Sequence, residues 1–107
     1  MKLLLNENMP HAFRHDIPGH DVRTADYMGW KGRVNGELLA LERDEFDVII
    51  TLDKSMENQQ NLTEDDVGLM VIRAGTDDIN VLRTLIPWIL EGLNTIRRGE
   101  IVRIFPL

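Results

Sequence analysis

The chain has 107 residues, enough for one domain built around one core. No run approaches the roughly 20 consecutive apolar residues that span a bilayer, which argues against a membrane protein. The absence of cysteine excludes disulfides and thiolate metal sites and suits the cytoplasm. A formal net charge of −6 argues against a broad phosphate-binding surface, but it is compatible with carboxylates gathered around a divalent cation.

Two predicted strands flank a short helix at the start of the chain. Residues 2–5 form a short apolar run closed by polar residues, which is typical of a buried strand. Pro10 suits the first turn of a helix with Asn8 as its N-cap, and Pro18 with the glycine after it limits the length of that helix. Residues 20–24 are interpreted as the second strand.

The middle of the chain predicts a loop, a helix and a central strand. The loop covers residues 25–34, and Asn35 caps a helix over 35–45 whose apolar residues fall on one face. Residues 47–52 contain a β-branched run that is typical of a central parallel strand. The polar segment 54–62 predicts a short helix followed by a loop.

The last part of the chain predicts two strands on either side of the longest helix. Residues 68–72 form a buried strand, and a helix begins at Asp77 or Asp78 with apolar residues spaced by three and four. Pro87 falls inside this pattern and is expected to kink or split the helix. Residues 101–105 form the last strand.

Strands that alternate with helices in this way predict an α/β domain over residues 1–107 with a parallel sheet. Ligands of such sheets bind beyond the carboxyl ends of the strands. The residues that follow the predicted strands are polar and rich in oxygen ligands: Asn6, Glu7, Asn8, Asp53, Lys54 and Arg73.

Each candidate ligand has a structural interpretation beside the functional one. Asp53 either binds a ligand or caps a helix that begins at Lys54. Glu37 is either a third acidic ligand or a residue that interacts with its helix dipole. Glu7 either turns into the site or stays a solvated charge. Clustered carboxylates repel one another unless a hard cation such as Mg²⁺ or Mn²⁺ joins them, and the spacing alone does not choose between these interpretations.

The histidines and tryptophans give weaker signals. His11 and His15 are four residues apart, as in some zinc sites, but no companion acidic motif is present, so we interpret them as surface residues. Trp30 and Trp88 are interpreted as core or interface residues rather than platforms for nucleobases. A homodimer that uses Trp88 and the apolar last helix is compatible with the sequence.

Short motifs follow one another along nearly the whole chain: LLLNENMP (3–10), GHDV (19–22), GW (29–30), NGELL (35–39), FDVIITLD (46–53) and QQNL (59–62). Together they resemble the small PIN-like proteins of bacteria and archaea, which look related to the toxin nucleases of toxin–antitoxin pairs. Each motif is weak alone, and their order and spacing make the resemblance fairly specific.

The resemblance implies a three-layer α/β/α sandwich with a mainly parallel central sheet and a metal-dependent ribonuclease ancestry. It implies that Glu37 and Asp53 are acidic site positions and that Asn8, Gln60 and Asn61 are polar neighbours. The chain departs from the family at Asn6, where the first strand commonly ends in Asp. An amide keeps an oxygen ligand but lacks the negative charge, which puts catalysis in doubt.

The first hypothesis is a cytoplasmic, toxin-like ribonuclease that uses Mg²⁺ or Mn²⁺ and has an antitoxin-like protein partner. Asp53, Glu37 and Asn6 would bind the metal, Glu7 would complete the site, and Lys54 or Arg73 would contact the phosphates of RNA. The second hypothesis is a non-catalytic PIN-like domain that binds a protein or an RNA. A phosphorylation receiver is a distant third, because the first strand lacks paired acids.

Overall fold

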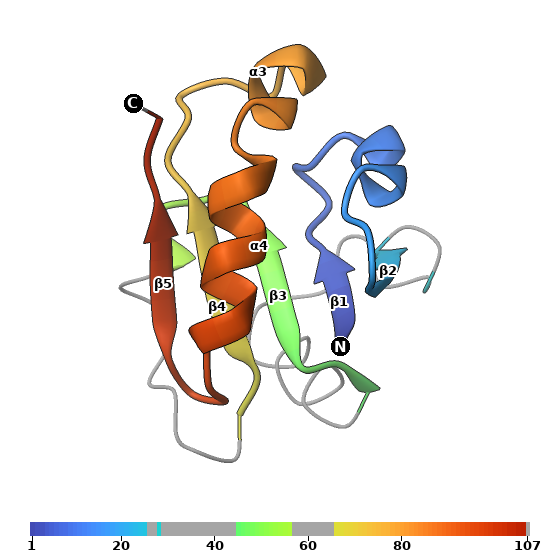
Figure 1. Ribbon diagram of the computed structural model, residues 1–107, viewed down its shortest axis with the longest axis vertical. Helices are drawn as coiled ribbons and strands as arrows, with labels where there is room; N and C mark the ends of the chain where they lie inside the picture. The colour runs from blue at the N-terminus through green and yellow to red at the C-terminus, as the bar shows by residue number, and fades with distance from the viewer. Residues whose placement is uncertain (26–27, 29–44, 57–65, 107) are drawn as a thin grey trace.

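The computed structural model describes residues 1–25, 28, 45–56 and 66–106, and these residues form a single five-stranded sheet with helices packed on it (Figure 1). The strands are β1 (Lys2–Leu5), β2 (Asp21–Thr24), β3 (Val48–Thr51), β4 (Gly68–Ile72) and β5 (Ile101–Ile104). The helices are a 3₁₀ helix, η1 (His11–His15), and two α-helices, α3 (Ile79–Arg83) and α4 (Ile86–Thr95). The predicted α/β class is therefore correct.

The strand order is β2-β1-β3-β4-β5, and every neighbouring pair is parallel. The chain leaves β1 toward one side to form β2, and then returns to the other side of β1 to form β3. In an open parallel sheet, this reversal makes a topological switch point between β1 and β3, where ligands bind beyond the carboxyl ends of the strands.

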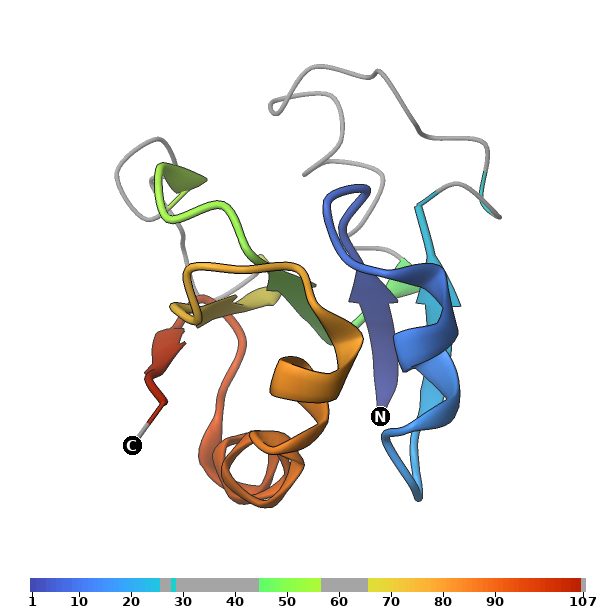
Figure 2. The same ribbon diagram turned by 90° about the horizontal axis from the view of Figure 1, so that it is seen from above.

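One face of the sheet is covered by η1, α3 and α4 (Figure 2). Leu3 and Leu5 of β1 point toward this face, as do Val48 and Ile50 of β3, because alternate residues of a strand point to the same side. They pack with side chains from the helices in one cluster that contains Phe13, Leu82, Leu85, Ile89 and Leu93.

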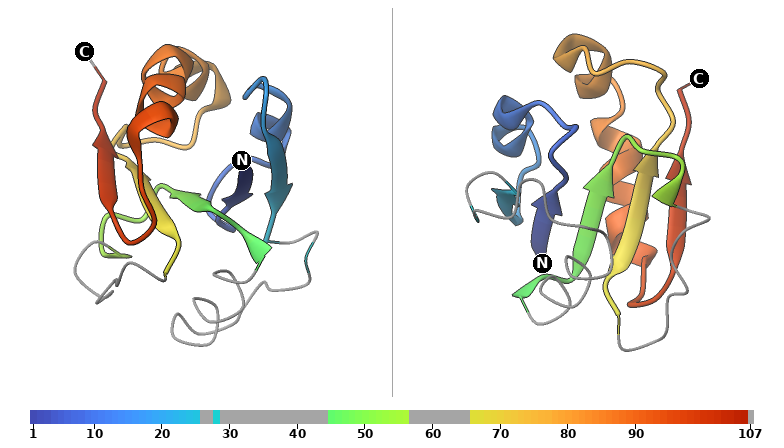
Figure 3. Two further views of the ribbon diagram at one scale, coloured as in Figure 1. Left: turned by 60° about the horizontal axis from the view of Figure 1, so that its bottom comes forward. Right: turned by 180° about the vertical axis from the view of Figure 1, so that it is seen from behind.

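The opposite face of the sheet is also buried. Its cluster is made by the residues that alternate with the first set, together with side chains just outside the strands: Leu4, Phe46, Ile49, Met56, Val67, Leu69 and Val71. Figure 3 views the sheet from this side in its right-hand panel. Burial on both faces explains why the strand sequences are continuously apolar rather than alternating.

The predicted long helix is split into α3 and α4. Asp78 caps α3, because its carboxylate accepts a hydrogen bond of 2.9 Å from the backbone N–H of Asn80. The helix ends before Thr84, and Pro87 lies in the first turn of α4, where its missing N–H leaves no hydrogen bond unmade. Pro87 thus splits the apolar pattern, as predicted.

The short helix predicted before Pro18 is present as the 3₁₀ helix His11–His15, but two predictions about its start are wrong. Pro10 is the N-cap rather than a residue of the first turn, and no side chain makes a capping bond, so Asn8 is not the cap. Asn8 instead bonds to a loop far away in the sequence, as described below. The helix predicted over 35–45 lies outside the described residues except for Glu45, as does most of the segment 54–62. None of the described helices is long and apolar enough to cross a membrane.

Candidate functional site

The polar residues predicted to gather at the carboxyl edge of the sheet do follow strands that end there. Asn6, Glu7 and Asn8 come directly after β1, and Asp53 follows β3 after one intervening residue. Because β1 and β3 are neighbours on the two sides of the switch point, the loops after them lie together at that edge. Hydrogen bonds between the two loops confirm this proximity.

Asn8 links the first loop to the end of β3. Its Oδ1 accepts a hydrogen bond of 3.1 Å from the backbone N–H of Leu52, and its Nδ2 lies 3.2 Å from Oγ1 of Thr51. Since a backbone N–H can only donate, the bond to Leu52 fixes which end of the amide is the oxygen. Asn8 is therefore a tether between the loops rather than the cap of a helix.

Asp53 forms a local turn as well as facing the candidate site. Its backbone N–H donates to Oγ1 of Thr51 at 3.0 Å, and its carboxylate Oδ1 accepts from the backbone N–H and the hydroxyl of Ser55 at 2.9 and 2.6 Å. These bonds close a turn onto Ser55, whereas most of the helix that Asp53 was predicted to cap lies outside the described residues. Both bonds fall on Oδ1, so among the described residues Oδ2 is the oxygen available to a ligand.

Asn6 lies half-buried between β1 and the loop after β3. Its backbone N–H donates to the carbonyl of Ile50 at 2.9 Å, and its Nδ2 lies 3.2 Å from Sδ of the buried Met56. A thioether is a weak acceptor, so the amide nitrogen faces Met56 and Oδ1 is turned away from that sulfur. Asn6 can thus present an oxygen to a ligand, but without a negative charge.

Three other candidates have different surroundings. Glu7 and Lys54 are exposed, and Arg73 is half-buried after β4. The guanidinium of Arg73 lies 5.5 Å from the ring centroid of Phe105, which is close enough for a cation–π interaction. Phe105 was predicted as the last residue of the final strand, but β5 ends at Ile104 and Phe105 follows it, at the same edge as the polar candidates.

Three more candidates, Glu37, Gln60 and Asn61, lie outside the described residues, so the predicted approach of Glu37 to Asp53 stays a prediction. Within the part of the chain that the structure describes, no group of three or more histidine or acidic side chains could hold a metal ion. The oxygens of Asp53 and Asn6 fit Mg²⁺ or Mn²⁺ in kind, because both ions prefer hard oxygen ligands. Together these two side chains supply only one negative charge.

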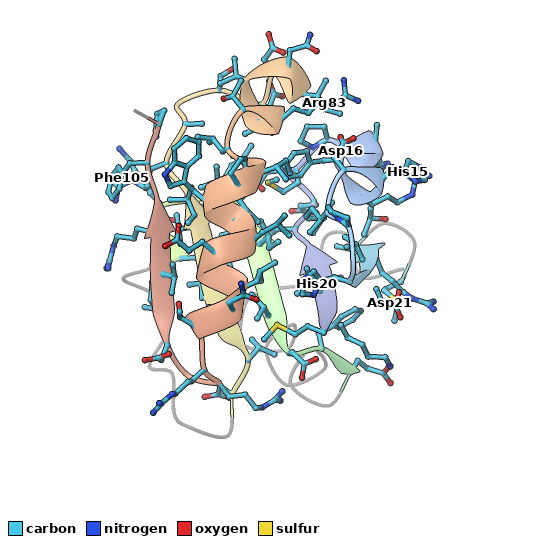
Figure 4. The ribbon with its side chains drawn as sticks, viewed as in Figure 1. His15, Asp16, His20, Asp21, Arg83 and Phe105 are labelled. Carbon is cyan, nitrogen blue, oxygen red and sulfur yellow. The ribbon has the colours of Figure 1, made fainter. Side chains whose placement is uncertain are left out.

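The histidines lie away from this edge. His11 and His15 are exposed, as interpreted, and a 3₁₀ helix aligns residues three apart rather than four. His20 precedes β2, near the amino edge of the sheet (Figure 4), and its Nδ1 is buried with no hydrogen-bond partner among the described residues. Burial, and secondarily the positive charge of the Met1 amino group, lower the pKa of His20.

No protein-family model matches the chain, and neither a curated protein nor a solved structure matches it. The resemblance to PIN-like proteins therefore stays a prediction that depends on the sequence motifs.

Proposed function

We propose that the protein is a PIN-like, metal-dependent ribonuclease built as a three-layer α/β/α sandwich. The observation that supports this function is that the loops after β1 and β3 lie together at the switch point. Asn8 of the first loop bonds to Leu52, and Asn6 contacts Met56, so the first loop touches the second on both sides of Asp53. Burial of both faces of the sheet is what a three-layer arrangement requires. The ordered motifs of the sequence point to the same family.

In this proposal, Asp53, Asn6 and Glu37 hold Mg²⁺ or Mn²⁺, with Glu7 beside them. The ion would supply charge stabilisation and an activated water for phosphodiester hydrolysis. Ser55 orients the carboxylate of Asp53 through Oδ1, and Thr51 holds the backbone of the same residue.

Lys54 comes after β3 and Arg73 comes after β4, and both strands end at the edge of the sheet that carries the candidate site. A positive side chain at this edge can contact an RNA phosphate. Gln60 and Asn61 remain the proposed polar neighbours of this site.

The test is cleavage of single-stranded RNA by the purified protein in Mn²⁺, compared with the same reaction in EDTA. Asp53→Ala should lower the rate by about a hundredfold or more, because a metal ligand supports several kcal/mol of transition-state stabilisation. Glu91→Gln is a matched control, since Glu91 is an exposed acid on α4, across the sheet from the site. Equal rates for Asp53→Ala and the wild type would end the nuclease proposal.

A second candidate function is a non-catalytic domain that keeps the fold and binds a protein or RNA partner. The observation that favours it is Asn6, whose amide contacts a thioether where an acid would have supplied charge. Calorimetric titration with Mn²⁺ separates the two candidates, because a non-catalytic domain should bind no ion at millimolar concentration. Asn6→Asp should then create or strengthen binding. Tight Mn²⁺ binding by the wild type would contradict the non-catalytic function.

The strand order also suits a phosphorylation receiver, since that fold shares the order β2-β1-β3-β4-β5. A receiver needs paired acids after β1 and a lysine at the end of a later strand. This chain has Asn6 and Glu7 after β1, and β5 is followed by Phe105. The ribonuclease proposal therefore explains the edge residues better.

The partner and the location follow from the family rather than from the site. A toxin-like member would act in the cytoplasm, bind an antitoxin-like protein and form a homodimer in some cases. Trp88 is 39% exposed on α4, which makes it available to such an interface. A small DNA-binding reading frame next to the gene would support the toxin–antitoxin assignment, and co-expression of the two proteins would test whether they associate.

A further inference from the structure

The end of β5 carries an exposed aromatic side chain close to the candidate site. Among the residues that the structure describes, Phe105 is the most exposed large apolar one at 56%, and it lies just beyond the carboxyl end of its strand (Figure 4). The guanidinium of Arg73 covers its ring at 5.5 Å from the centroid. The ring is thus supported by a cation while more than half of the residue remains accessible to solvent.

The sheet register brings this aromatic pair into line with Asp53. Thr51 is paired with Val71, and Val71 is paired with Arg103. Two residues after each of these partners, at the ends of three adjacent strands, come Asp53 (after Thr51), Arg73 (after Val71) and Phe105 (after Arg103). The ladder continues as far as Arg73, whose backbone N–H donates to the carbonyl of Ile104 at 2.8 Å.

Strand alternation also assigns the pair to one face. Val71 and Ile101 pack in the cluster on the face away from α4, whereas Ile72 and Ile104 pack in the cluster beneath it. Arg73 follows Ile72, and Phe105 follows Ile104. Because successive residues of a strand point to opposite faces, both side chains are directed away from α4. Adjacent strands are about 4.8 Å apart, which separates the ends of β3 and β5 by about 10 Å, roughly three stacked nucleotide rises.

We propose that Phe105, supported by Arg73, is a stacking platform for an unpaired base of single-stranded RNA whose backbone passes Asp53. Every base has a face that can stack on an aromatic ring, so the platform is tolerant of sequence. Arg73 holds the ring and adds a positive charge beside the RNA backbone. The choice of RNA as the ligand rests on the proposed ribonuclease function, whereas the platform itself rests on the geometry at the ends of β4 and β5.

The experiment measures RNA binding without catalysis. The full chain is titrated into a fluorescein-labelled, single-stranded ten-nucleotide RNA in EDTA, and fluorescence anisotropy gives the Kd. Phe105→Ala should raise the Kd by about tenfold or more, and Phe105→Tyr should stay close to the wild type because it keeps the ring. An oligomer that has the same backbone but no bases should bind the wild type as weakly as the RNA binds Phe105→Ala.

Trp88→Ala is the matched control, since Trp88 is an exposed aromatic residue on α4, on the other face of the sheet. It should leave the Kd unchanged. Circular dichroism melting should show that Phe105→Ala keeps its fold, because the removed ring is exposed.

Several outcomes would overturn the platform: no RNA binding by the wild type, equal Kd values for Phe105→Ala and the wild type, or an equal loss with Trp88→Ala. A change from dimer to monomer in Phe105→Ala, seen by size-exclusion chromatography, would also overturn it, because a second copy would then cover the ring. Failure of the proposed nuclease is a separate result, because it is read from cleavage by Asp53→Ala in Mn²⁺, whereas this assay contains EDTA.

Discussion

Thr51 is the residue at which the two loops of the candidate site are joined. Its side chain is fully buried, and its hydroxyl accepts from the backbone N–H of Asp53 while lying 3.2 Å from Nδ2 of Asn8. Because Thr51 is fully buried, its hydroxyl makes these hydrogen bonds within the protein rather than to water. The hydroxyl therefore fixes the backbone of Asp53 relative to the loop after β1.

Replacing Thr51 by valine, which has the same shape, should lower the free energy of unfolding by about 0.5–1.5 kcal/mol, because the hydrogen bonds from Asp53 and Asn8 to the hydroxyl are lost. Urea denaturation measures the change, and amide hydrogen exchange should show faster exchange at Asp53. Thr51→Ser keeps the hydroxyl and is the control. Protection of the Asp53 amide that is the same in Thr51→Val and the wild type would contradict this role.

His20 should make the protein less stable in mild acid. Its pKa in the folded protein is lowered, chiefly by burial and secondarily by the Met1 amino group, so the unfolded chain binds its proton more readily. The stability contributed by neutral His20 is fully present above the ordinary histidine pKa of 6.5 and is lost as the pH falls below it. The urea concentration at the midpoint of unfolding should therefore fall as the pH is lowered from 7.5 to 5. This range includes the ordinary histidine pKa of 6.5, at which the unfolded chain takes up the proton.

The variant His20→Gln should flatten this pH dependence, because it removes the group that titrates. His15→Gln is the matched control, since His15 is exposed on η1. The two variants would have equal slopes against pH if burial of His20 had no effect on its protonation.

The candidate site could be predicted in part from single residues. The position of Asp53 directly after a β-branched run was sufficient to place it at the carboxyl edge of the sheet, and its turn onto Ser55 follows from residue type. The role of Asn8 could not be predicted, because its partner Leu52 is distant in sequence and competes with the local capping position. Which of two hydrogen bonds an asparagine makes depends on the tertiary structure.

At the scale of elements, one side of α4 is buried against the sheet and the other is exposed to solvent. Ile89 and Leu93 are buried against the sheet, whereas Trp88 and Glu91 are exposed on the outer side. The spacing of three and four in the sequence identified the buried side correctly. The conformation of η1 could not be predicted, because a short segment with few apolar residues has no periodicity that distinguishes a 3₁₀ helix from an α-helix.

Two neighbouring substitutions test this division of α4. Ile89→Ala should lower the free energy of unfolding by about 2–5 kcal/mol, because it removes a fully buried side chain from the larger cluster. Trp88→Ala should cost less, although it removes more atoms, because the indole is 39% exposed and its removal leaves no enclosed cavity. Thermal or urea unfolding provides both values, and a larger loss for Trp88→Ala would contradict the packing described.

At the scale of the whole molecule, the sheet is a two-sided core. Leu4 and Leu5 are consecutive residues of β1, both are fully buried, and they belong to different clusters. The sequence predicted the strands to within one residue at most ends, because their apolar runs are continuous. It did not determine the strand order, since an apolar run does not indicate on which side of β1 the third strand pairs.

Leu4→Ala and Leu5→Ala should each lower the free energy of unfolding by about 2–5 kcal/mol, because each leaves a cavity in a closed cluster. Equal losses measured by urea denaturation would show that the face away from α4 is as well packed as the face beneath it. A change of only a few tenths of a kcal/mol for Leu4→Ala, as at exposed positions, would contradict burial of the second face.

Because all five strands run in the same direction, β1 begins and β5 ends at opposite edges of the sheet (Figure 1). An affinity tag attached after Leu107 would follow Phe105 by two residues and could compete with a ligand there. A tag placed before Met1 avoids that edge, but it removes the amino group that acts on His20. An affinity tag at the N-terminus therefore suits the measurements of ligand binding. The measurement of stability in acid needs a tag that is cleaved off completely, so that the amino group of Met1 is restored.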